Sequence, residues 1–515
     1  MKKFLIILFV FFTSQVDVSA IIRLPSVFND NMVLQQNKIV NLWGFASPHE
    51  NITVEFNGQV VNGVANAQGN WKVELQPMQA GGPFEMIIKG TNTIILKNIL
   101  IGEVWICSGQ SNMEFPLKKT NDAEKEIAQA DLPSIRIFIV KRTCASDMQE
   151  DCKGKWQVCS PKTVGDFSGV AYYFGKNLNK ELEVPIGLIQ ATWGGSPAEA
   201  WMSNEVLESD SDFKPILERW NNQIKNYPEV LQEYNRDKDS LLKKWFSDST
   251  VAVNKGMAPP RKPNVPEGPG SRNTPSGLFN GMIAPLVSLS FQGVIWYQGE
   301  ANAGRAFQYR RLFPTLIRNW RQSWNAGEFP FYFVQLPNLF RQPEPSKSGW
   351  AELREAQLIT LSEPNTGMAV TIDVGDPTNL HPTNKSDVGF RLSLIALNKD
   401  YNKKDIVFSG PIYKSFKIGN DKILLQFTHT GNGLISKNGD EIKGFTIASG
   451  DKKFVTASAK IEGDQVVVWS DQIKNPVAVR YAWADNPECN LYNGANLPAS
   501  PFRTDDWEEH TFNKK

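Results

Sequence analysis

The sequence predicts an α/β protein in which a parallel sheet flanked by helices lies between an N-terminal β-sandwich and a C-terminal β module. Three observations predict this arrangement. Short alternating segments separated by Asn-Gly, Gly-Asn and Gly-Gly turns fill residues 21–100, a pattern typical of a β-sandwich. Apolar strands alternate with helical stretches over residues 101–404, which indicates a parallel sheet covered by helices. Alternation of apolar and polar residues then returns over residues 405–515.

The first 20 residues have the pattern of an export signal. Lys2 and Lys3 precede an apolar run over residues 4–12, and small residues lead up to Ala20. The run is far shorter than the roughly 20 residues that cross a bilayer. We therefore expect a signal peptide at residues 1–20, a mature chain that is periplasmic or extracellular, and no membrane span.

The overall composition limits the classes of function that the chain can have. A chain of 515 residues with 41% hydrophobic and 21% charged residues is globular and too long for one ordinary domain. Its net charge of +1 gives no electrostatic reason to expect nucleic acid as a partner. Four scattered histidines argue against a catalytic metal, and the Gly-rich stretches lack the lysine of a phosphate loop. We therefore expect neither a metal nor another cofactor.

The five cysteines fit an exported protein without forming a disulfide scaffold. Cys144, Cys152 and Cys159 lie in one loop-like stretch, where we expect a disulfide whose pairing the sequence does not define. Cys107 lies on an apolar run and is expected to be a buried small hydrophobic residue.

The central region is predicted to contain five further strands and one insert. The strands are expected at residues 135–140, 186–191, 293–297, 331–335 and 367–372. The insert, at about 204–273, is charged and helical in period over 206–246 and rich in Pro and Gly over 256–273. It is too long for an ordinary connection. We expect either a lid over a site or a solvated helical hairpin with a loop.

Ser111 is the strongest candidate for a catalytic residue. The apolar run Val104–Cys107 ends abruptly in Ser108-Gly109-Gln110-Ser111, so a buried strand would deliver this serine to the edge of the sheet. The carboxyl edge of the strands is where α/β proteins keep their active sites. A serine is a weak nucleophile until a base takes its proton, and the chain must therefore supply a base.

His381 is the candidate base by elimination. The other three histidines, His49, His429 and His510, lie in the two β-rich regions and the charged tail. His381 lies in a turn-rich loop between an apolar run that ends at Ile372 and a helical pattern over 388–397. Such loops are a usual location for catalytic residues, although a lone histidine can also simply fill a loop.

Two further strand ends have the same character as the serine turn. Trp193-Gly194-Gly195-Ser196-Pro197 follows one predicted strand, and Gln298-Gly299-Glu300-Ala301-Asn302 follows another. Acyl transfer needs hydrogen-bond donors at the developing oxyanion, and glycine N–H groups or a side-chain amide can supply them. Three such strand ends together with His381 predict one acyl-transfer site. Glu300 and Asn302 are candidates for a substrate contact or a main-chain contact.

These residues resemble a known family. The segments Gly102–Trp105, Gln110–Glu114, Trp193–Gly195, Trp296–Glu300 and Asp376–Pro382 are similar to the sialate O-acetylesterases, which belong to the SGNH hydrolase superfamily. The similarity extends to Arg480–Trp483 and Leu497–Phe502, and so covers nearly the whole mature chain. The long serine motif is specific, whereas Gly-Gly or His-Pro alone would not be.

The resemblance implies a role for each matching residue. Ser111 would be the nucleophile, and its own N–H would be one oxyanion donor. Gly194 or Gly195 would supply a second N–H, and the side chain of Gln298 a third donor. His381 would deprotonate the serine, protonate the departing sugar hydroxyl and then activate water.

The sequence departs from the superfamily where the acid of a triad is expected. An aspartate commonly lies three residues before the histidine, but Thr378 occupies that position here. Asp376, in the same loop, is then the preferred orienting acid, with Asp373 as the alternative. A main-chain carbonyl in place of either would leave a Ser-His dyad, and both aspartates could instead cap local turns.

The predicted function is a secreted carbohydrate O-acetylesterase that acts through a serine acyl-enzyme on an O-acetylated sugar or glycan. The substrate stays open between O-acetylated sialic acid and acetylated plant polysaccharides such as xylan or xyloglucan. Arg354 could bind a substrate carboxylate, or it could form a structural ion pair. A function of another class, a carbohydrate-binding protein with a catalytically silent central domain, is the alternative.

Overall fold

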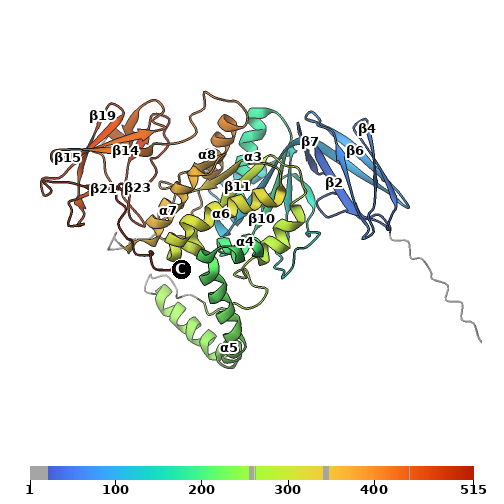
Figure 1. Cartoon of the computed structure of the whole chain (residues 1–515), viewed down its shortest axis with the longest axis horizontal. Helices are drawn as coiled ribbons and strands as arrows, with labels where there is room; N and C mark the ends of the chain where they lie inside the picture. The colour runs from blue at the N-terminus through green and yellow to red at the C-terminus, as the bar shows by residue number, and fades with distance from the viewer. Residues whose placement is uncertain (1–20, 255–259, 261, 340–346, 440) are drawn as a thin grey trace, which may run out of the picture.

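The computed structural model describes residues 21–254, 260, 262–339, 347–439 and 441–515, so the predicted signal peptide lies outside the described residues. Three regions follow one another along the long axis of the molecule (Figure 1), with N-terminal strands at one end and C-terminal strands at the other. The predicted combination of a central α/β sheet with additional β sheets is confirmed in this form. None of the described helices is long and apolar enough to cross a membrane.

The N-terminal region consists of short strands, antiparallel except for β1, and its core is continuous with that of the central region. Alternate residues of a strand, such as Ile52, Val54 and Phe56, are buried while their neighbours face outward, as the predicted period of two requires. Its strands are β1 (Val33–Gln35), β2 (Val40–Phe45), β3 (Asn51–Phe56), β4 (Gln59–Val64), β5 (Asn70–Leu75) and β6 (Gly81–Lys89).

One long strand joins this region to the centre of the molecule. Strand β7 (Thr93–Gly109) pairs with β6 in its first half and with the central strands from Glu103 onward. The predicted boundary at residue 100 therefore falls inside a continuous strand. From Leu100 to Gly109 every residue of β7 is buried, which explains why the apolar run Val104–Cys107 does not alternate with polar residues.

The central sheet has the order β13-β12-β11-β7-β10-β8-β9 and is parallel except for β9. Its strands beside β7 are β8 (Leu132–Ile139), β9 (Trp156–Cys159), β10 (Ile186–Thr192), β11 (Gly293–Tyr297), β12 (Phe331–Val334) and β13 (Thr366–Ala369). Helices pack around it in two pairs, α3 with α8 and α6 with α7. The helices of this region are α1 (Ser111–Glu114), α2 (Ala123–Ala128), α3 (Gly169–Leu182), α6 (Ala306–Trp324), α7 (Gly349–Ile359) and α8 (Ser386–Lys399).

The parallel pairing places the three predicted strand ends at one edge. In the ladder, Gly109 of β7 lies between Thr192 of β10 and Tyr297 of β11. The turns that begin at Gln110, Trp193 and Gln298 therefore leave the sheet side by side.

The insert forms α4 (Asn204–Ser209) and a helix of 41 residues, α5 (Lys214–Asn254), with Pro228 inside it. In Figure 1 this helix projects from the body of the molecule. The described part of the Pro/Gly-rich stretch, residues 260 and 262–273, contains no helix or strand. This stretch returns to the sheet edge, because a Cβ on Gly195 would lie 3.1 Å from the guanidinium carbon of Arg272.

The expected disulfide is wrong, because all five cysteines are free thiols. Cys152 and Cys159 are buried apart from each other in the core, where Cys159 Sγ lies 3.8 Å from the carbonyl of Ala130. Cys107 is fully buried as predicted.

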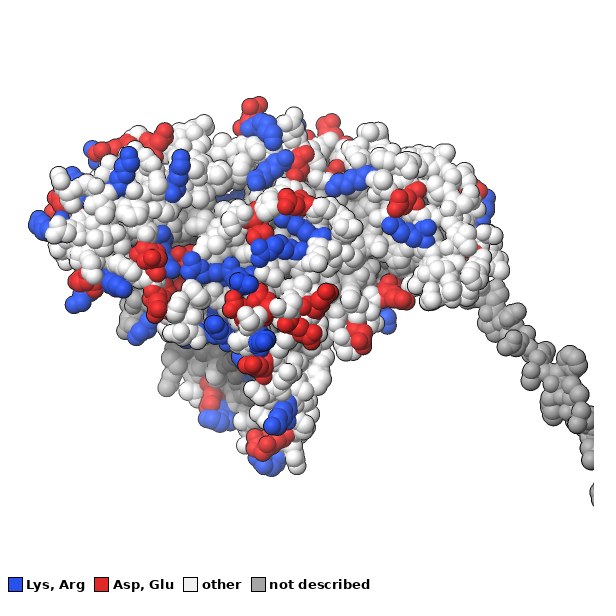
Figure 2. Space-filling model, in the orientation of Figure 1, with Lys and Arg blue, Asp and Glu red and all other residues white. Residues whose placement is uncertain are grey.

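The C-terminal region has its own hydrophobic core. Two four-stranded sheets and one two-stranded sheet surround it. Their strands are β14 (Ile412–Gly419), β15 (Lys422–Thr428), β20 (Gln465–Trp469) and β19 (Ser458–Glu462); β18 (Val455–Thr456), β17 (Phe445–Ala448), β21 (Ala478–Tyr481) and β23 (Phe502–Arg503); and β16 (Leu434–Ser436) with β22 (Leu491–Asn493). Positive and negative side chains are interspersed over the face of the molecule in Figure 2, without a single-signed patch.

Candidate active site

The structure brings the candidate nucleophile and base together. Ser111 Oγ lies 2.8 Å from His381 Nε2, although 270 residues separate them in the chain. Ser111 opens α1 immediately after β7, and Gly109 makes the turn with a φ of 134°. A Cβ at position 109 would lie 2.2 Å from the carbonyl oxygen of Tyr297, so only glycine fits where the chain leaves the sheet.

His381 is half-buried in the loop that follows β13. Its ring stacks on Phe115 with a centroid separation of 6.2 Å, and its main-chain N–H donates to Asn379. Burial, followed by the charges of Lys385 and Lys119, lowers the pKa of His381 below its ordinary value of 6.5. The imidazole is therefore neutral at neutral pH and can accept the serine proton.

A cavity of about 500 Å³ lies over this pair, lined by Ser111 and His381 among others. Its rim carries the charged side chains Glu114, Lys119, Lys141, Arg142 and Asp166. Glu114 is ion-paired with Arg142, and it also accepts a hydrogen bond of 2.7 Å from the N–H of Gly194. The reacting atoms are thus accessible from solvent at a polar surface.

The glycine turn lies against the serine. A Cβ on Gly194 would lie 3.3 Å from Ser111 Cβ. The main-chain N–H groups of Ser111 and Gly195 donate to no described residue, and both stay available to an oxyanion. The N–H of Gly194 is occupied by Glu114.

Gln298 does not point to the serine as the resemblance implies. Its amide nitrogen donates to the carbonyl of Ser196 (3.2 Å) and to Asn302 Oδ1 (2.7 Å), and its amide oxygen accepts from Tyr309 (2.8 Å). The side chain is fully buried. Because both donors are already bonded inside the protein, the assignment of Gln298 as an oxyanion donor is not supported by this geometry.

Neither candidate aspartate contacts His381. Asp376 accepts hydrogen bonds of 2.8 Å from the main-chain N–H and the hydroxyl of Thr378, and so caps its own turn. Asp373 forms a bidentate ion pair with Arg391 at 2.6 and 2.8 Å. The expectation that Asp376 orients the histidine is therefore corrected: among the described residues, no group hydrogen-bonds Nδ1 of His381.

Arg354 and Asn302 are structural in this geometry. Arg354 is fully buried and donates to four main-chain carbonyls, those of Leu336, Pro337, Ala484 and Asp485. It ties α7 to the C-terminal region and cannot reach a substrate carboxylate, so that alternative is wrong. Asn302 is also buried, and its amide is bonded to Ala198, Gln298 and Glu199.

Glu300 belongs to a buried network beneath the catalytic pair. The amide nitrogen of Asn112 donates to Glu300 (2.5 Å) and to the carbonyl of Leu380 (3.0 Å). The ammonium of Lys385 donates to the amide oxygen of the same Asn112 at 2.6 Å. Asn112 follows Ser111 and Leu380 precedes His381, so one side chain joins the two catalytic segments.

Burial dominates the electrostatics of this network. It lowers the pKa of Lys385 to about 7, although the nearby Glu300 opposes the shift. It also raises the pKa of Glu300 above its ordinary value, against the hydrogen bond from Asn112 and the charge of Lys385. Sequence reasoning missed Lys385, because a lysine at the start of a helix carries no local signal of burial.

Three arginines gather beside the glycine turn. Arg219, Arg272 and Arg305 line a cavity of about 360 Å³ together with Gly195. Two carboxylates pair with them: Glu199 with Arg305 (3.2 Å) and Arg219 (3.8 Å), and Glu267 with Arg272 (2.9 Å). Each arginine keeps one buried nitrogen that has no hydrogen-bond partner among the described residues. The insert supplies two of the three, so it forms one wall beside the candidate active site.

No metal ligand set accompanies the pair. Across the described parts of the chain, no three His, Cys, Asp or Glu side chains group closely enough to hold an ion.

Comparison with known proteins gives concordant matches. Residues 101–233 and 275–396 match the family profile described as carbohydrate esterase, sialic acid-specific acetylesterase. The chain is 31% identical to the sialate O-acetylesterase of Rattus norvegicus over 93% of this chain and 94% of that protein. It is 30% identical to the Homo sapiens sialate O-acetylesterase over 93% and 92% of the two chains.

Among solved structures, the chain is similar to a carbohydrate acetylesterase from Xanthomonas citri. The two are 36% identical with a TM-score of 0.80, and the match covers 95% of this chain and 100% of the other. The similarity therefore includes both outer β regions as well as the central sheet.

Proposed function

Because the chain belongs to the sialate O-acetylesterase family of carbohydrate esterases, we propose that it removes acetyl groups from sugar hydroxyls through an acetyl-Ser111 intermediate on an SGNH-type fold. Family membership supports a carboxylic ester hydrolase. The observation that carries the serine mechanism is the 2.8 Å contact between Ser111 Oγ and His381 Nε2.

In the first step, His381 Nε2 takes the proton of Ser111 as its oxygen attacks the acetyl carbonyl carbon. The N–H groups of Ser111 and Gly195 are free to stabilise the oxyanion of the tetrahedral intermediate. The N–H of Gly194 joins them if the Glu114 oxygen that accepts from it moves away while the other oxygen stays paired with Arg142. The intermediate collapses when His381 protonates the departing sugar oxygen, which leaves acetyl-Ser111.

In the second step, neutral His381 takes a proton from water as the water oxygen attacks the acetyl carbonyl carbon. His381 then returns that proton to Ser111 Oγ as the ester bond breaks, which releases acetate and restores the serine. No carboxylate among the described residues orients the ring. The contact with Phe115 and the tie from Asn112 to Leu380 support a Ser-His dyad in which the loop itself fixes the imidazole.

The test is the trapping of the intermediate. Rapid acid quench of the enzyme with para-nitrophenyl acetate, followed by peptide mass spectrometry, is expected to find one acetyl group on Ser111. Ser111→Ala is expected to lose both the adduct and the steady-state hydrolysis. Hydrolysis retained by a folded Ser111→Ala would contradict the mechanism and mean that another nucleophile acts.

For the substrate, we propose an O-acetylated sialic acid, with acetylated plant polysaccharide as the alternative. The arginine cavity beside Gly195 supports this choice, because three guanidinium groups face only two carboxylates there. Arginine binds carboxylates well, and a neutral xylan chain offers none. Acetate release from O-acetylated sialic acid and from acetylated xylo-oligosaccharides, measured side by side, decides between the two.

Variants of the arginines test whether this cavity binds the substrate carboxylate. Arg219→Gln and Arg272→Gln are expected to raise KM for the acetylated sialic acid by roughly tenfold, because each removes a charge-assisted contact to the substrate. Arg318→Gln, an exposed arginine paired with Glu363 away from this cavity, is the matched control. Equal KM values for all three variants would exclude the cavity as a carboxylate site.

We also propose that the protein is exported, on the pattern of its first 20 residues. Expression of the full chain in a bacterial host, followed by fractionation and N-terminal sequencing, is expected to find a periplasmic product that begins at Ile21. A product that keeps Met1 in the cytoplasm would overturn this proposal.

A further inference from the structure

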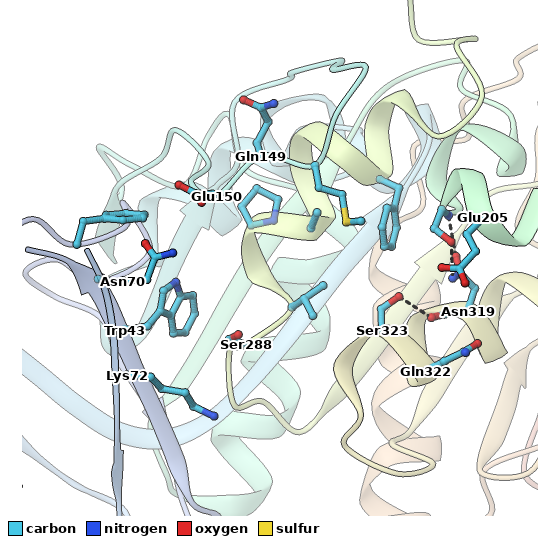
Figure 3. Close-up of a pocket in the computed structure, with 18 of the residues that line it drawn as sticks. Trp43, Asn70, Lys72, Gln149, Glu150, Glu205, Ser288, Asn319, Gln322 and Ser323 are labelled. Carbon is cyan, nitrogen blue, oxygen red and sulfur yellow. Dashed lines mark hydrogen bonds between the residues drawn. The ribbon is translucent and has the colours of Figure 1, made fainter. Parts of the chain in front are cut away.

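A second cavity, larger than the one over Ser111, lies between the N-terminal β region and the central region. Its volume is about 820 Å³, within the range of about 300–1,000 Å³ typical of ligand sites. Figure 3 shows Trp43, Asn70 and Lys72 along one side and Glu205, Gln322 and Ser323 along the other. We call this cavity the interdomain cleft.

Aromatic and apolar side chains form part of its lining. Trp43 on β2 is half-buried, and a T-shaped contact with Phe28 at 4.6 Å holds its ring in place. Phe45 lies two residues further along the same strand, and Met148, which is 67% exposed, also lines the cleft. Ring faces and thioethers of this kind bind the C–H faces of sugar rings without fixing the sugar's identity.

Polar side chains with no internal partner complete the lining. Asn70, Glu150, Glu205 and Gln322 line the cleft and are exposed, and none of them has a side-chain hydrogen bond or ion pair to a described residue. They come from β5, the loop after β8, α4 and α6. Amides and carboxylates placed around an aromatic ring are suited to bind hydroxyl groups.

The charges of the lining favour a neutral ligand. Its one cation among the described residues, Lys72, already pairs with Glu74 at 3.3 Å. Glu150 and Glu205 remain unpaired, so an anionic chain would be repelled. The cleft thus differs from the arginine cavity beside Gly195, where cations are in excess.

One loop lines both the cleft and the catalytic cavity. Lys141 and Arg142 lie at the rim of the cavity over Ser111, and Met148 to Glu150 lie at the cleft. The six Cα–Cα steps from Arg142 to Met148 can span about 20 Å at most. One extended chain of a few sugars can therefore reach both sites.

We propose that the interdomain cleft is a second sugar-binding site, which holds the neutral oligosaccharide part of a glycan whose acetylated sugar lies at Ser111. The assignment rests on the proposed function for the role of Ser111, but binding in the cleft needs no catalysis. The N-terminal β region then contributes directly to substrate affinity, because β2 and β5 form one side of the cleft.

Direct binding tests the proposal. The full chain with Ser111→Ala is titrated with two neutral probes, xylohexaose and a lacto-N-tetraose chain, by calorimetry and tryptophan fluorescence. At least one probe is expected to bind and to change the fluorescence. Adding Trp43→Ala is expected to weaken that binding roughly tenfold, as for an aromatic residue at the centre of an interface. Trp245→Ala, which removes a half-buried tryptophan of α5 away from the cleft, is expected to leave it unchanged.

A second variant guards against misfolding of the N-terminal region. Asn70→Ala with Gln322→Ala changes two exposed side chains that have no internal partner, and it is also expected to weaken binding several-fold. Binding of neither probe, or equal affinity in the cleft variants and the Trp245→Ala control, overturns the proposal. Acetate release by the wild-type enzyme is scored separately, so failure of the cleft and failure of the esterase mechanism are distinguishable.

Discussion

The two segments that meet at the catalytic pair are held in contrasting ways. Around Ser111, Gln110, Asn112 and Met113 are almost fully buried, and the turn is fixed by the end of the central strand β7. Around His381, residues 377–379 are exposed, and the loop holds its shape mainly through local turns. Besides the Ser111–His381 pair itself, the contact of Asn112 with Leu380 and the stacking of Phe115 on His381 reach from one segment to the other. The serine is thus positioned by the core, whereas the histidine is positioned by a loop that a buried amide and an aromatic ring anchor.

The largest effect on turnover is expected when the buried segment around Ser111 loses the nucleophilic hydroxyl. Ser111→Ala should lower kcat for para-nitrophenyl acetate by about 10⁴-fold or more, because no other group forms the acyl-enzyme. Steady-state hydrolysis at enzyme concentrations high enough to detect the residual rate measures this loss. The melting temperature should stay the same, since His381 is the one described residue that the hydroxyl bonds. A drop of less than tenfold in a folded variant would mean that another nucleophile acts.

On the loop side, His381→Gln should lower kcat by about 10²–10⁴-fold, the usual contribution of a general base. Glutamine keeps a polar side chain but accepts no proton at neutral pH. Its residual rate should rise with hydroxide concentration, since solvent base then replaces the imidazole. If the pH profile of His381→Gln kept the acid limb of the wild type, another group would be the base.

Breaking the tie between the two segments should have a smaller effect on turnover. Asn112→Ala removes bonds to Lys385, Glu300 and Leu380 and leaves two buried ionisable groups without their partner. We expect kcat to fall roughly 10- to 100-fold with little change in KM, and the protein to lose about 1–3 kcal/mol of stability. Stopped-flow assays and thermal melts measure the two effects.

The matched control is Asn493→Ala in the C-terminal region. Asn493 is equally buried and is bonded to main-chain groups at Ser409, His429, Ala495 and Leu497. A comparable loss of stability with unchanged kcat is expected there. Equal loss of kcat in both variants would mean that the effect of Asn112 is general destabilisation.

The same contrast explains what the sequence could predict. Ser111 was predictable because an apolar run that ends in small residues is a local signal, and the strand order then brings its neighbours to the same edge. His381 was predictable by elimination among four histidines. Their contact of 2.8 Å, however, depends on packing between segments far apart in the chain.

The corrected residues depend on contacts that no short pattern records. Gln298 follows a strand as predicted, but its amide turns toward Tyr309 and Asn302 because those partners lie behind it. Arg354 has the period of a helix residue, but the C-terminal region covers it and supplies carbonyl acceptors. The cleft beside Trp43 likewise exists only where two regions meet.

A smaller effect should come from the charge nearest the histidine loop. Lys119 and Lys385 both lower the pKa of His381, so Lys119→Gln should raise it. The direction of the effect follows from the role of His381 as a base. Activity needs the neutral imidazole, and a raised pKa leaves a larger fraction of the imidazole protonated as the pH falls. The acid limb of kcat/KM should therefore move to higher pH, with an unchanged plateau. Lys118→Gln, whose lysine already pairs with Asp166, is the control and should move the limb less.

The smallest effect on turnover is expected from Asp376→Asn, which separates a dyad from a triad. Loss of an orienting aspartate costs about 10⁴-fold in a triad, but Asp376 bonds only its own turn at Thr378. We expect a loss of less than about tenfold. A loss near 10⁴-fold would show that Asp376 turns to His381 during catalysis.

Asp373→Asn should instead act on stability, because it removes the charge that Arg391 neutralises in a largely buried pair. The hydrogen bonds and charge of Arg391 outweigh burial and lower the pKa of Asp373. A carboxyl with a lowered folded-state pKa stabilises the protein above its unfolded pKa, and that contribution disappears as the pH falls through the folded value. Denaturant melts should therefore show the wild type and Asp373→Asn furthest apart at neutral pH and converging in acid. A kcat loss in Asp373→Asn much greater than in Asp376→Asn, with equal stability of the two variants, would instead assign the orienting role to Asp373.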